Sequence, residues 1–199
     1  MKAAFVIFDR MTSLDFIGFY DPVTRLKTMK ILPDFDWRIC SRVPRVVDDR
    51  GLCIEADSVA EPLDAYDLLF VPGGFGTRSL QHDATFIDWL KTAQPVHLKV
   101  SVCTGALLLG AAGFLQGRRA TTHPSAYDEL KPYCGTVVRE RVVDAGDIIT
   151  ARGVSSAIDA GLYLVQRLAG AEARDRIAAQ MDYPYRMEAA RTADPGRKS

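Results

Sequence analysis

The sequence predicts an α/β protein with a mostly parallel sheet that helices cover on both faces. Short runs of consecutive apolar residues recur along the chain, as is typical of strands that are buried on both faces. Segments with helical spacing of apolar residues alternate with these runs. Glycine-rich or abrupt turns follow two of the runs. Because ligand sites of such sheets lie at the carboxyl ends of the strands, the candidate site residues should be sought there.

The expected strands are apolar or alternating segments at residues 3–8, 36–41, 68–71, 99–102, 120–122, 136–143 and 148–151. A β-hairpin is expected over residues 45–57, because apolar and polar residues alternate around the turn sequence Asp49-Arg50-Gly51. A second turn, at residues 144–147, should join the last two strands.

The expected helices cover residues 14–29, 77–93, 104–112, 124–130, 155–169 and 172–181. Pro22 interrupts the first of them, so we expect a break or a new helix start there. Asp83 is expected to act as an N-cap within the second. The chain has no internal repeat or linker, so residues 1–185 are expected to form one domain, followed by a polar, mobile tail at residues 186–199.

The net charge of the chain and the lengths of its apolar runs argue against nucleic acid and membranes as partners. The chain of 199 residues has 25 Lys and Arg against 25 Asp and Glu, which argues against a broad surface for nucleic acid or an anionic membrane. The apolar run at the N-terminus is too short for a signal peptide and ends at Asp9. No stretch approaches the length of a transmembrane helix. We therefore expect a cytoplasmic protein that binds neither nucleic acid nor membrane.

Cysteine and glycine spacing argues against a cofactor or metal. The four cysteines are widely spaced with no CxxC pair and there are three histidines, so we expect reduced thiols and no structural zinc. The glycine-rich segment VPGGFG at residues 71–76 has neither the GxGxxG spacing nor the lysine of a nucleoside triphosphate loop. No cofactor is expected.

The segment VSVCTGAL at residues 100–107 places Cys103 between an apolar strand and a helix of small residues. The abrupt turn leaves little room for side chains, which suits Gly105. Its geometry is similar to the turn that exposes the nucleophile of α/β-hydrolases, although the sequence is not GxSxG. Free N–H groups at the start of the helix should favour the thiolate and lower the pKa of Cys103. We expect Cys103 to be a reactive nucleophile.

A second interpretation of Cys103 is a small apolar residue that fills a tight junction. The turn from strand to helix favours the reactive interpretation. The other cysteines lack this setting, since Cys40 lies in a strand, Cys53 in the hairpin and Cys134 in a loop. We interpret those three as structural.

The glycine-rich segment also follows a buried strand and should lie beside Cys103. Its glycines allow the backbone to approach other groups closely. We expect the N–H groups of Gly74 and Thr104 to form an oxyanion hole. Substrate contacts are also expected from Gly73, Phe75 and Gly105.

Asp15 is the candidate acid that would handle protons for the cysteine. It follows the first strand, and its neighbours are apolar, so its pKa should be raised enough for general acid or base work. An alternative is that Asp15 caps the helix that follows. His123 ends another expected strand and is a second candidate partner for Cys103, although a structural role is the commoner one for such a histidine.

Four segments of the chain are recognisable together: LDFIGFYDPV, VPGGFG, VCTGALLLGAAGFLQGRRATTHP and ARGVSSAIDAGLYLV. With them, nearly the whole chain resembles the ThiJ/PfpI superfamily, whose members are relatives of the class I glutamine amidotransferases. Within it, the likeness is to isonitrile hydratases and to the sensor-like domains of AraC-type regulators. The resemblance implies a flavodoxin-like three-layer α/β/α sandwich and a homodimer. AraC-type regulators add a DNA-binding region, and too few residues follow Met181 for one, so we do not expect this protein to regulate transcription by binding DNA.

The resemblance implies a catalytic set of Cys103, Asp15 and Thr104. Many other members have a glutamate at the acid position and a histidine after the cysteine, so this set favours a hydratase over a protease-like or glyoxalase-like enzyme. The implied reaction is hydration of a small isonitrile to an N-substituted formamide, through a Cys103 thioimidate and with Asp15 as general acid and base. The alternative is a non-catalytic protein of the same superfamily that binds a ligand or senses oxidants through Cys103.

Overall fold

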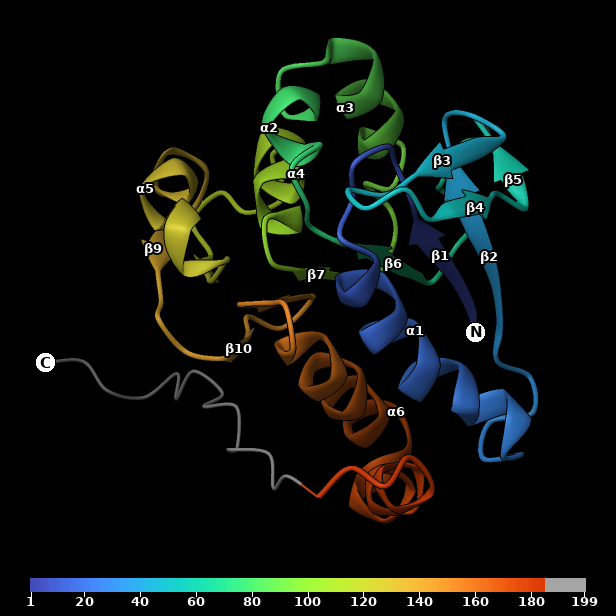
Figure 1. The fold of residues 1–199 in the computed structure, drawn as a ribbon. Coiled ribbons are helices and arrows are strands. Elements are labelled where there is room, and N and C mark those ends of the chain that lie inside the picture. The colour runs from blue at the N-terminus through green and yellow to red at the C-terminus, as the bar shows by residue number, and fades with distance from the viewer. Residues whose placement is uncertain (185–199) are drawn as a thin grey trace, which may run out of the picture.

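A seven-stranded sheet forms the middle layer of the computed structural model, which describes residues 1–184 (Figure 1). The tail expected at residues 186–199 lies outside the described residues. The strands, in spatial order, are β10 (Val142–Asp144), β11 (Ile148–Ala151), β7 (Leu98–Val102), β6 (Leu68–Val71), β1 (Lys2–Val6), β2 (Asp36–Ser41) and β5 (Ser58–Val59). Only the pair of β10 and β11 is antiparallel within this sheet. The expected mostly parallel sheet is therefore confirmed.

Helices cover both faces of the sheet. Figure 1 shows α1 (Ser13–Thr28) and α6 (Ser156–Gln180) together on one face, and α2 (Thr77–Leu80), α3 (Ala84–Lys91) and α4 (Gly105–Ala111) on the other. Every residue of β6, β7 and β11 is buried, as the apolar runs predict for strands between two helical layers. The three-layer sandwich is confirmed.

The break expected at Pro22 is wrong, because α1 continues through it as a single helix. The pyrrolidine ring packs closely on α6: a Cβ added to Gly161 would lie 2.5 Å from Pro22 Cγ. Burial of the ring against α6 offsets the backbone hydrogen bond that a proline removes from a helix.

The segment expected as one helix at residues 77–93 is two helices, α2 and α3. The Asp83 carboxylate accepts hydrogen bonds from the N–H groups of Thr85 and Phe86, so the predicted N-cap is confirmed and explains where α3 begins. The last helix, α6, bends at Gly170, whose φ of 87° is not helical. The two segments expected at 155–169 and 172–181 lie on either side of this bend.

Several smaller elements lie outside the seven-stranded sheet. β3 (Arg45–Val47) and β4 (Cys53–Glu55) form the expected antiparallel hairpin. The strand expected at 136–143 is divided into β9 (Thr136–Val137) and β10, and β9 pairs outside the main sheet with β8 (Arg119–Ala120). Between β8 and β9 the chain forms three short helical turns, η1 (Pro124–Ala126), α5 (Tyr127–Leu130) and η2 (Lys131–Tyr133). None of the helices within residues 1–184 is long and apolar enough to cross a membrane.

Candidate functional site

The candidate site lies where three neighbouring strands end. In the sheet order, β6 stands between β1 and β7, so the segments that follow these strands meet at one edge. The segment after β1 contains Asp15, the one after β6 contains Gly73 and Gly74, and the one after β7 contains Cys103. They border a cavity of about 620 Å³, lined by Thr12, Ser13, Leu14, Asp48, Asp49, Arg50, Gly74, Phe75, Arg78, Cys103, Thr104, His123, Ser125 and Val154.

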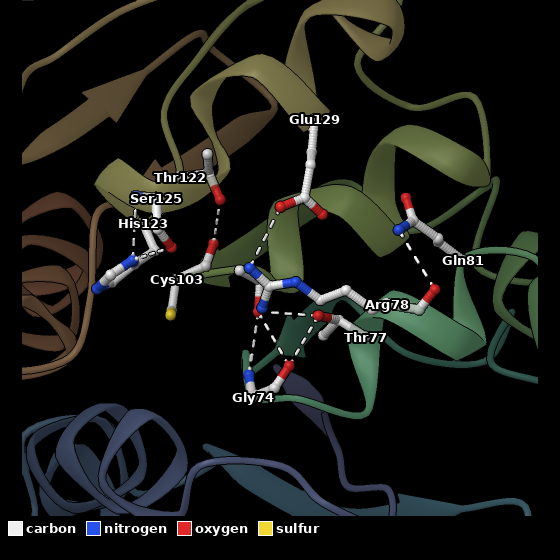
Figure 2. A network of polar contacts seen from close by, with 10 residues as sticks. Gly74, Thr77, Arg78, Gln81, Cys103, Thr122, His123, Ser125 and Glu129 are labelled. Atoms are coloured by element: carbon white, nitrogen blue, oxygen red, sulfur yellow. Dashed lines mark hydrogen bonds and ion pairs between the residues drawn. The ribbon is translucent and has the colours of Figure 1, made fainter.

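Cys103 occupies the tight turn between β7 and α4. Its φ of 56° lies in the left-handed region, which non-glycine residues rarely adopt. Its N–H donates to the carbonyl of Ala151 at 2.9 Å. Its own carbonyl accepts from Thr122 Oγ1 at 2.8 Å, a contact visible in Figure 2. Because both backbone groups are held, the turn keeps the thiol directed at the cavity.

Glycines make this turn possible. A Cβ at Gly105 would lie 2.3 Å from the Val71 carbonyl oxygen. A Cβ at Gly73 would lie 2.6 Å from Cys103 Cβ and 2.9 Å from Asp15 Oδ2. Since backbone and catalytic candidates are the neighbours in both cases, no larger residue fits without displacing them.

Asp15 is completely buried in the first turn of α1. Its Oδ2 atom accepts a hydrogen bond from the Gly73 N–H at 3.2 Å, so the carboxylate contacts the neighbouring loop. Its Oδ1 atom has no hydrogen-bond partner among the described residues. The N-cap of α1 is Thr12 and makes no side-chain cap, so the alternative in which Asp15 caps this helix is wrong.

The carboxyl of Asp15 and the thiol of Cys103 are electrostatically coupled. Burial raises the pKa of Asp15 to about 7, against the opposing effect of hydrogen bonds from Cys103 and Gly73. Burial, followed by the charge of Asp15, raises the pKa of Cys103 to about 12. The expected lowering of the thiol pKa is therefore wrong, because desolvation and the neighbouring acid outweigh the start of α4. At neutral pH the cysteine is a thiol beside a carboxyl that titrates.

Thr104 joins the glycine loop to the cysteine turn. The Gly74 N–H donates to Thr104 Oγ1 at 3.1 Å, and that hydroxyl lies 3.2 Å from the Gly74 carbonyl oxygen. Thr77 Oγ1 lies 2.9 Å from the same hydroxyl, and this network is drawn in Figure 2. Because the Gly74 N–H already donates to Thr104, the prediction that it forms part of an oxyanion hole is wrong. The N–H of Thr104 interacts with the Cys103 sulfur and is therefore a backbone donor at the thiol.

The profile of the DJ-1/PfpI family matches residues 1–167 of this chain. The chain belongs to the DJ-1/PfpI family. An isonitrile hydratase of Pseudomonas putida is 35% identical over 185 residues, which cover 92% of this chain and 78% of that protein. A ThiJ/PfpI family protein from Pseudomonas syringae has a TM-score of 0.82 at 28% identity, covering 94% of this chain and 76% of that one. Oxidized DJ-1 of Toxoplasma gondii has a TM-score of 0.77 at 26% identity, covering 92% and 99%.

Two parts of this DJ-1/PfpI site were missed by the sequence interpretation. Gly153, after β11, has a φ of 87°, and a Cβ there would lie 2.5 Å from Cys103 Cβ. The tip of the β3–β4 hairpin also reaches the cavity, where Thr12 Oγ1 donates to Asp49 Oδ2 at 3.0 Å and Ser13 Oγ donates to Asp48 Oδ2 at 2.6 Å. The ARGVSS segment marked Gly153 as part of a motif, whereas nothing in the hairpin sequence indicates where its tip docks.

His123 and Phe75 lie at the edge of the cavity. The His123 ring interacts through Nδ1 with Ser125 Oγ at 2.8 Å and accepts from the Ser125 N–H, so it caps η1 (Figure 2). This is the structural role that is commoner for such a histidine. Phe75 is 63% exposed and borders the mouth. Within residues 1–184, no three His, Cys, Asp or Glu side chains are grouped so that they could hold a metal ion.

Proposed function

We propose that this DJ-1/PfpI protein hydrates an isonitrile to an N-substituted formamide, with Cys103 as the nucleophile and Asp15 as general base and acid. The observation that carries the proposal is a buried carboxyl with a pKa of about 7 coupled to a buried thiol. A group that titrates near neutral pH can both take and return a proton. The similarity to the Pseudomonas putida isonitrile hydratase supports this choice of reaction.

The first step adds the S–H of Cys103 across the terminal carbon of the isonitrile. Ionised Asp15 takes the thiol proton as the sulfur attacks that carbon, and the proton is then delivered to the same carbon. The product is a thioimidate, R–N=CH–S–Cys103, which contains all atoms of both reactants. Because the thiol is protonated at rest, a base within the site is required for this attack.

The second step adds water to the thioimidate carbon. Asp15 removes a proton from the water, and the imine nitrogen gains one, which gives R–NH–CH(OH)–S–Cys103. Collapse of this adduct breaks the C–S bond, releases the formamide R–NH–CHO and restores the thiol. The Thr104 N–H stabilises developing charge on the sulfur. The Thr104 hydroxyl is a positioning group, because its contacts hold the Gly74 loop in place.

We infer a cytoplasmic homodimer that acts on a small molecule without a cofactor. Light scattering of the purified chain measures the oligomeric state, for which twice the monomer mass is expected.

The test measures formamide by liquid chromatography and mass spectrometry after incubation with cyclohexyl isonitrile. Wild type should form the formamide, and Cys103→Ala should not exceed the uncatalysed rate. Cys53→Ala is the matched control, because Cys53 is exposed in the hairpin and should keep the wild-type rate. A Cys103→Ala variant with wild-type turnover would exclude the mechanism.

Oxidant sensing is the second candidate, and the oxidized state of the Toxoplasma gondii relative is what favours it. Oxidation of a cysteine requires thiolate character and access. The raised pKa and burial of Cys103 oppose both. Selective oxidation of Cys103 by mild peroxide, without any turnover of isonitriles, would support this candidate over the hydratase.

A further inference from the structure

Arg78 places a cation on the wall of the cavity that contains Cys103. It is the second residue of α2, the short helix that follows the glycine loop. Figure 2 shows its side chain running from α2 toward the Glu129 carboxylate. No step of the proposed hydration uses this cation, so its place in the cavity needs another explanation.

Most of the donors of Arg78 have no partner within residues 1–184. An arginine side chain carries five N–H donors. Among the described residues, the guanidinium makes a single contact, from Nη2 to Glu129 Oε1 at 3.3 Å. The Arg78 and Glu129 side chains are 38% and 39% exposed, and ion pairs this open contribute little free energy. Arg78 is therefore available for a second carboxylate.

The other charged groups that line the cavity are already paired. Arg50 contacts the Asp49 carboxylate at 2.5 Å. Asp48 accepts from the Ser13 hydroxyl and from backbone N–H groups of its own turn. Arg50 is therefore engaged with Asp49, and Asp48 is held by hydroxyl and N–H donors, which leaves Arg78 as the cation of the cavity wall whose donors face no anion of the lining.

Part of the cavity wall is apolar. Leu14, Phe75 and Val154 line the cavity, and Phe75 is exposed at its edge. A ligand that fits these surfaces has an apolar middle, a reactive end at Cys103 and an anionic end at Arg78. A carboxylate matches the planar fork of a guanidinium and accepts two hydrogen bonds from it.

We propose that the cavity selects isonitriles that carry a carboxylate, and that Arg78 binds the carboxylate while Cys103 attacks the isonitrile carbon. This substrate class rests on the proposed hydratase function. Arg78 is a specificity residue, and the contact is the same in the ground and transition states. Its loss should therefore appear mainly in KM.

The experiment compares isocyanoacetate with its neutral methyl ester in wild type, Arg78→Gln, Arg78→Lys and Glu129→Gln. Wild type should prefer the carboxylate in kcat/KM. Arg78→Gln should reduce that preference about ten- to a hundred-fold, as expected for lost hydrogen bonds to a charged group. Arg78→Lys should keep part of the preference, because lysine retains the charge without the fork. Glu129→Gln removes only the competing carboxylate and should keep or increase the preference.

A binding measurement separates this proposal from the function on which it rests. N-formylglycine, the hydration product of isocyanoacetate, is titrated calorimetrically into wild type and Arg78→Gln, which needs no turnover. Weaker binding in Arg78→Gln supports carboxylate recognition even if no isonitrile is turned over, an outcome that removes the hydratase function alone. An unchanged dissociation constant, or an unchanged ratio of carboxylate to ester turnover, would overturn the role of Arg78.

Discussion

At the scale of single residues, the chemistry depends on where one proton sits between Asp15 and Cys103. Both groups are buried, and burial penalises the charged form of each. The Asp15 carboxyl is half protonated near pH 7, whereas the Cys103 thiol stays protonated to a much higher pH. In the proposed mechanism, the nucleophile is therefore generated by proton transfer within the site and not by a thiolate that exists in advance.

The pH profile follows from this order of titration. Because ionised Asp15 is the active form in the proposed mechanism, kcat/KM should rise with pH through about 7 and then level off. Because the pKa of Cys103 is about 12, the rise cannot come from the thiol. Asp15→Asn should lower the rate by about 10²- to 10⁴-fold, the usual contribution of a positioned base. Initial rates between pH 5 and pH 9, at about unit steps, measure the profile.

A substitution at Asp49 tests whether the rise in the pH profile comes from Asp15. The negative charge of Asp49 contributes to the raised pKa of Asp15 from the hairpin tip. Asp49→Asn keeps an oxygen that can accept from Thr12 and removes the charge, so the midpoint of the rise should move to lower pH. A midpoint that stays in place in this variant would mean that the titrating group is not Asp15.

Single residues also mark the limit of what the sequence predicts. Cys103 and Asp15 could be selected because an abrupt turn and an apolar neighbourhood are visible in the chain. The direction of the Cys103 pKa could not, because it depends on burial and on an acid 88 positions away (103 minus 15). Similarly, the Thr104 hydroxyl occupies the Gly74 N–H only once β6 and β7 are neighbours.

At the scale of elements, close backbone approaches keep the cysteine turn in place. Gly153, in the segment after β11, touches Cys103 from the side opposite to the glycine loop at Gly73. Pro22 and Gly161 give α1 and α6 a similarly close contact. The sequence marks these positions as possible breaks, and their role as contact points appears only when the partner element is known.

Gly153→Ala tests whether the close contact between Gly153 and Cys103 is needed for activity, and Gly113→Ala is its matched control. The two glycines have φ values of 87° and 86°, but a Cβ meets Cys103 at 2.5 Å in the first case and nothing within 4 Å in the second. Both variants should lose about 1–2 kcal/mol of unfolding free energy from left-handed alanine. Only Gly153→Ala should also lose most of its activity, because Cys103 must move.

Urea unfolding and the formamide assay measure the two effects separately. If Gly153→Ala formed the formamide at the same rate as Gly113→Ala, the position of Cys103 would not depend on this contact.

At the scale of the whole molecule, the sheet assembles the site from distant parts of the chain. Asp15, Gly73, Cys103 and Gly153 each follow a different strand, and the order β11-β7-β6-β1 brings those strand ends together. Alternation of strands and helices was enough to predict the layers and the edge at which the site lies. It did not predict the docking of the hairpin tip or of Arg78, because exposed polar residues carry no periodic signal.

The most direct test of the central claim is to detect the covalent intermediate on Cys103. Wild type mixed with cyclohexyl isonitrile, quenched in acid within the first turnover and digested, is analysed by mass spectrometry. The peptide containing Cys103 should gain the mass of one intact isonitrile molecule, and the adduct should decay as formamide appears. Formamide produced at the wild-type rate with no adduct on Cys103, or by Cys103→Ala, would contradict the central claim.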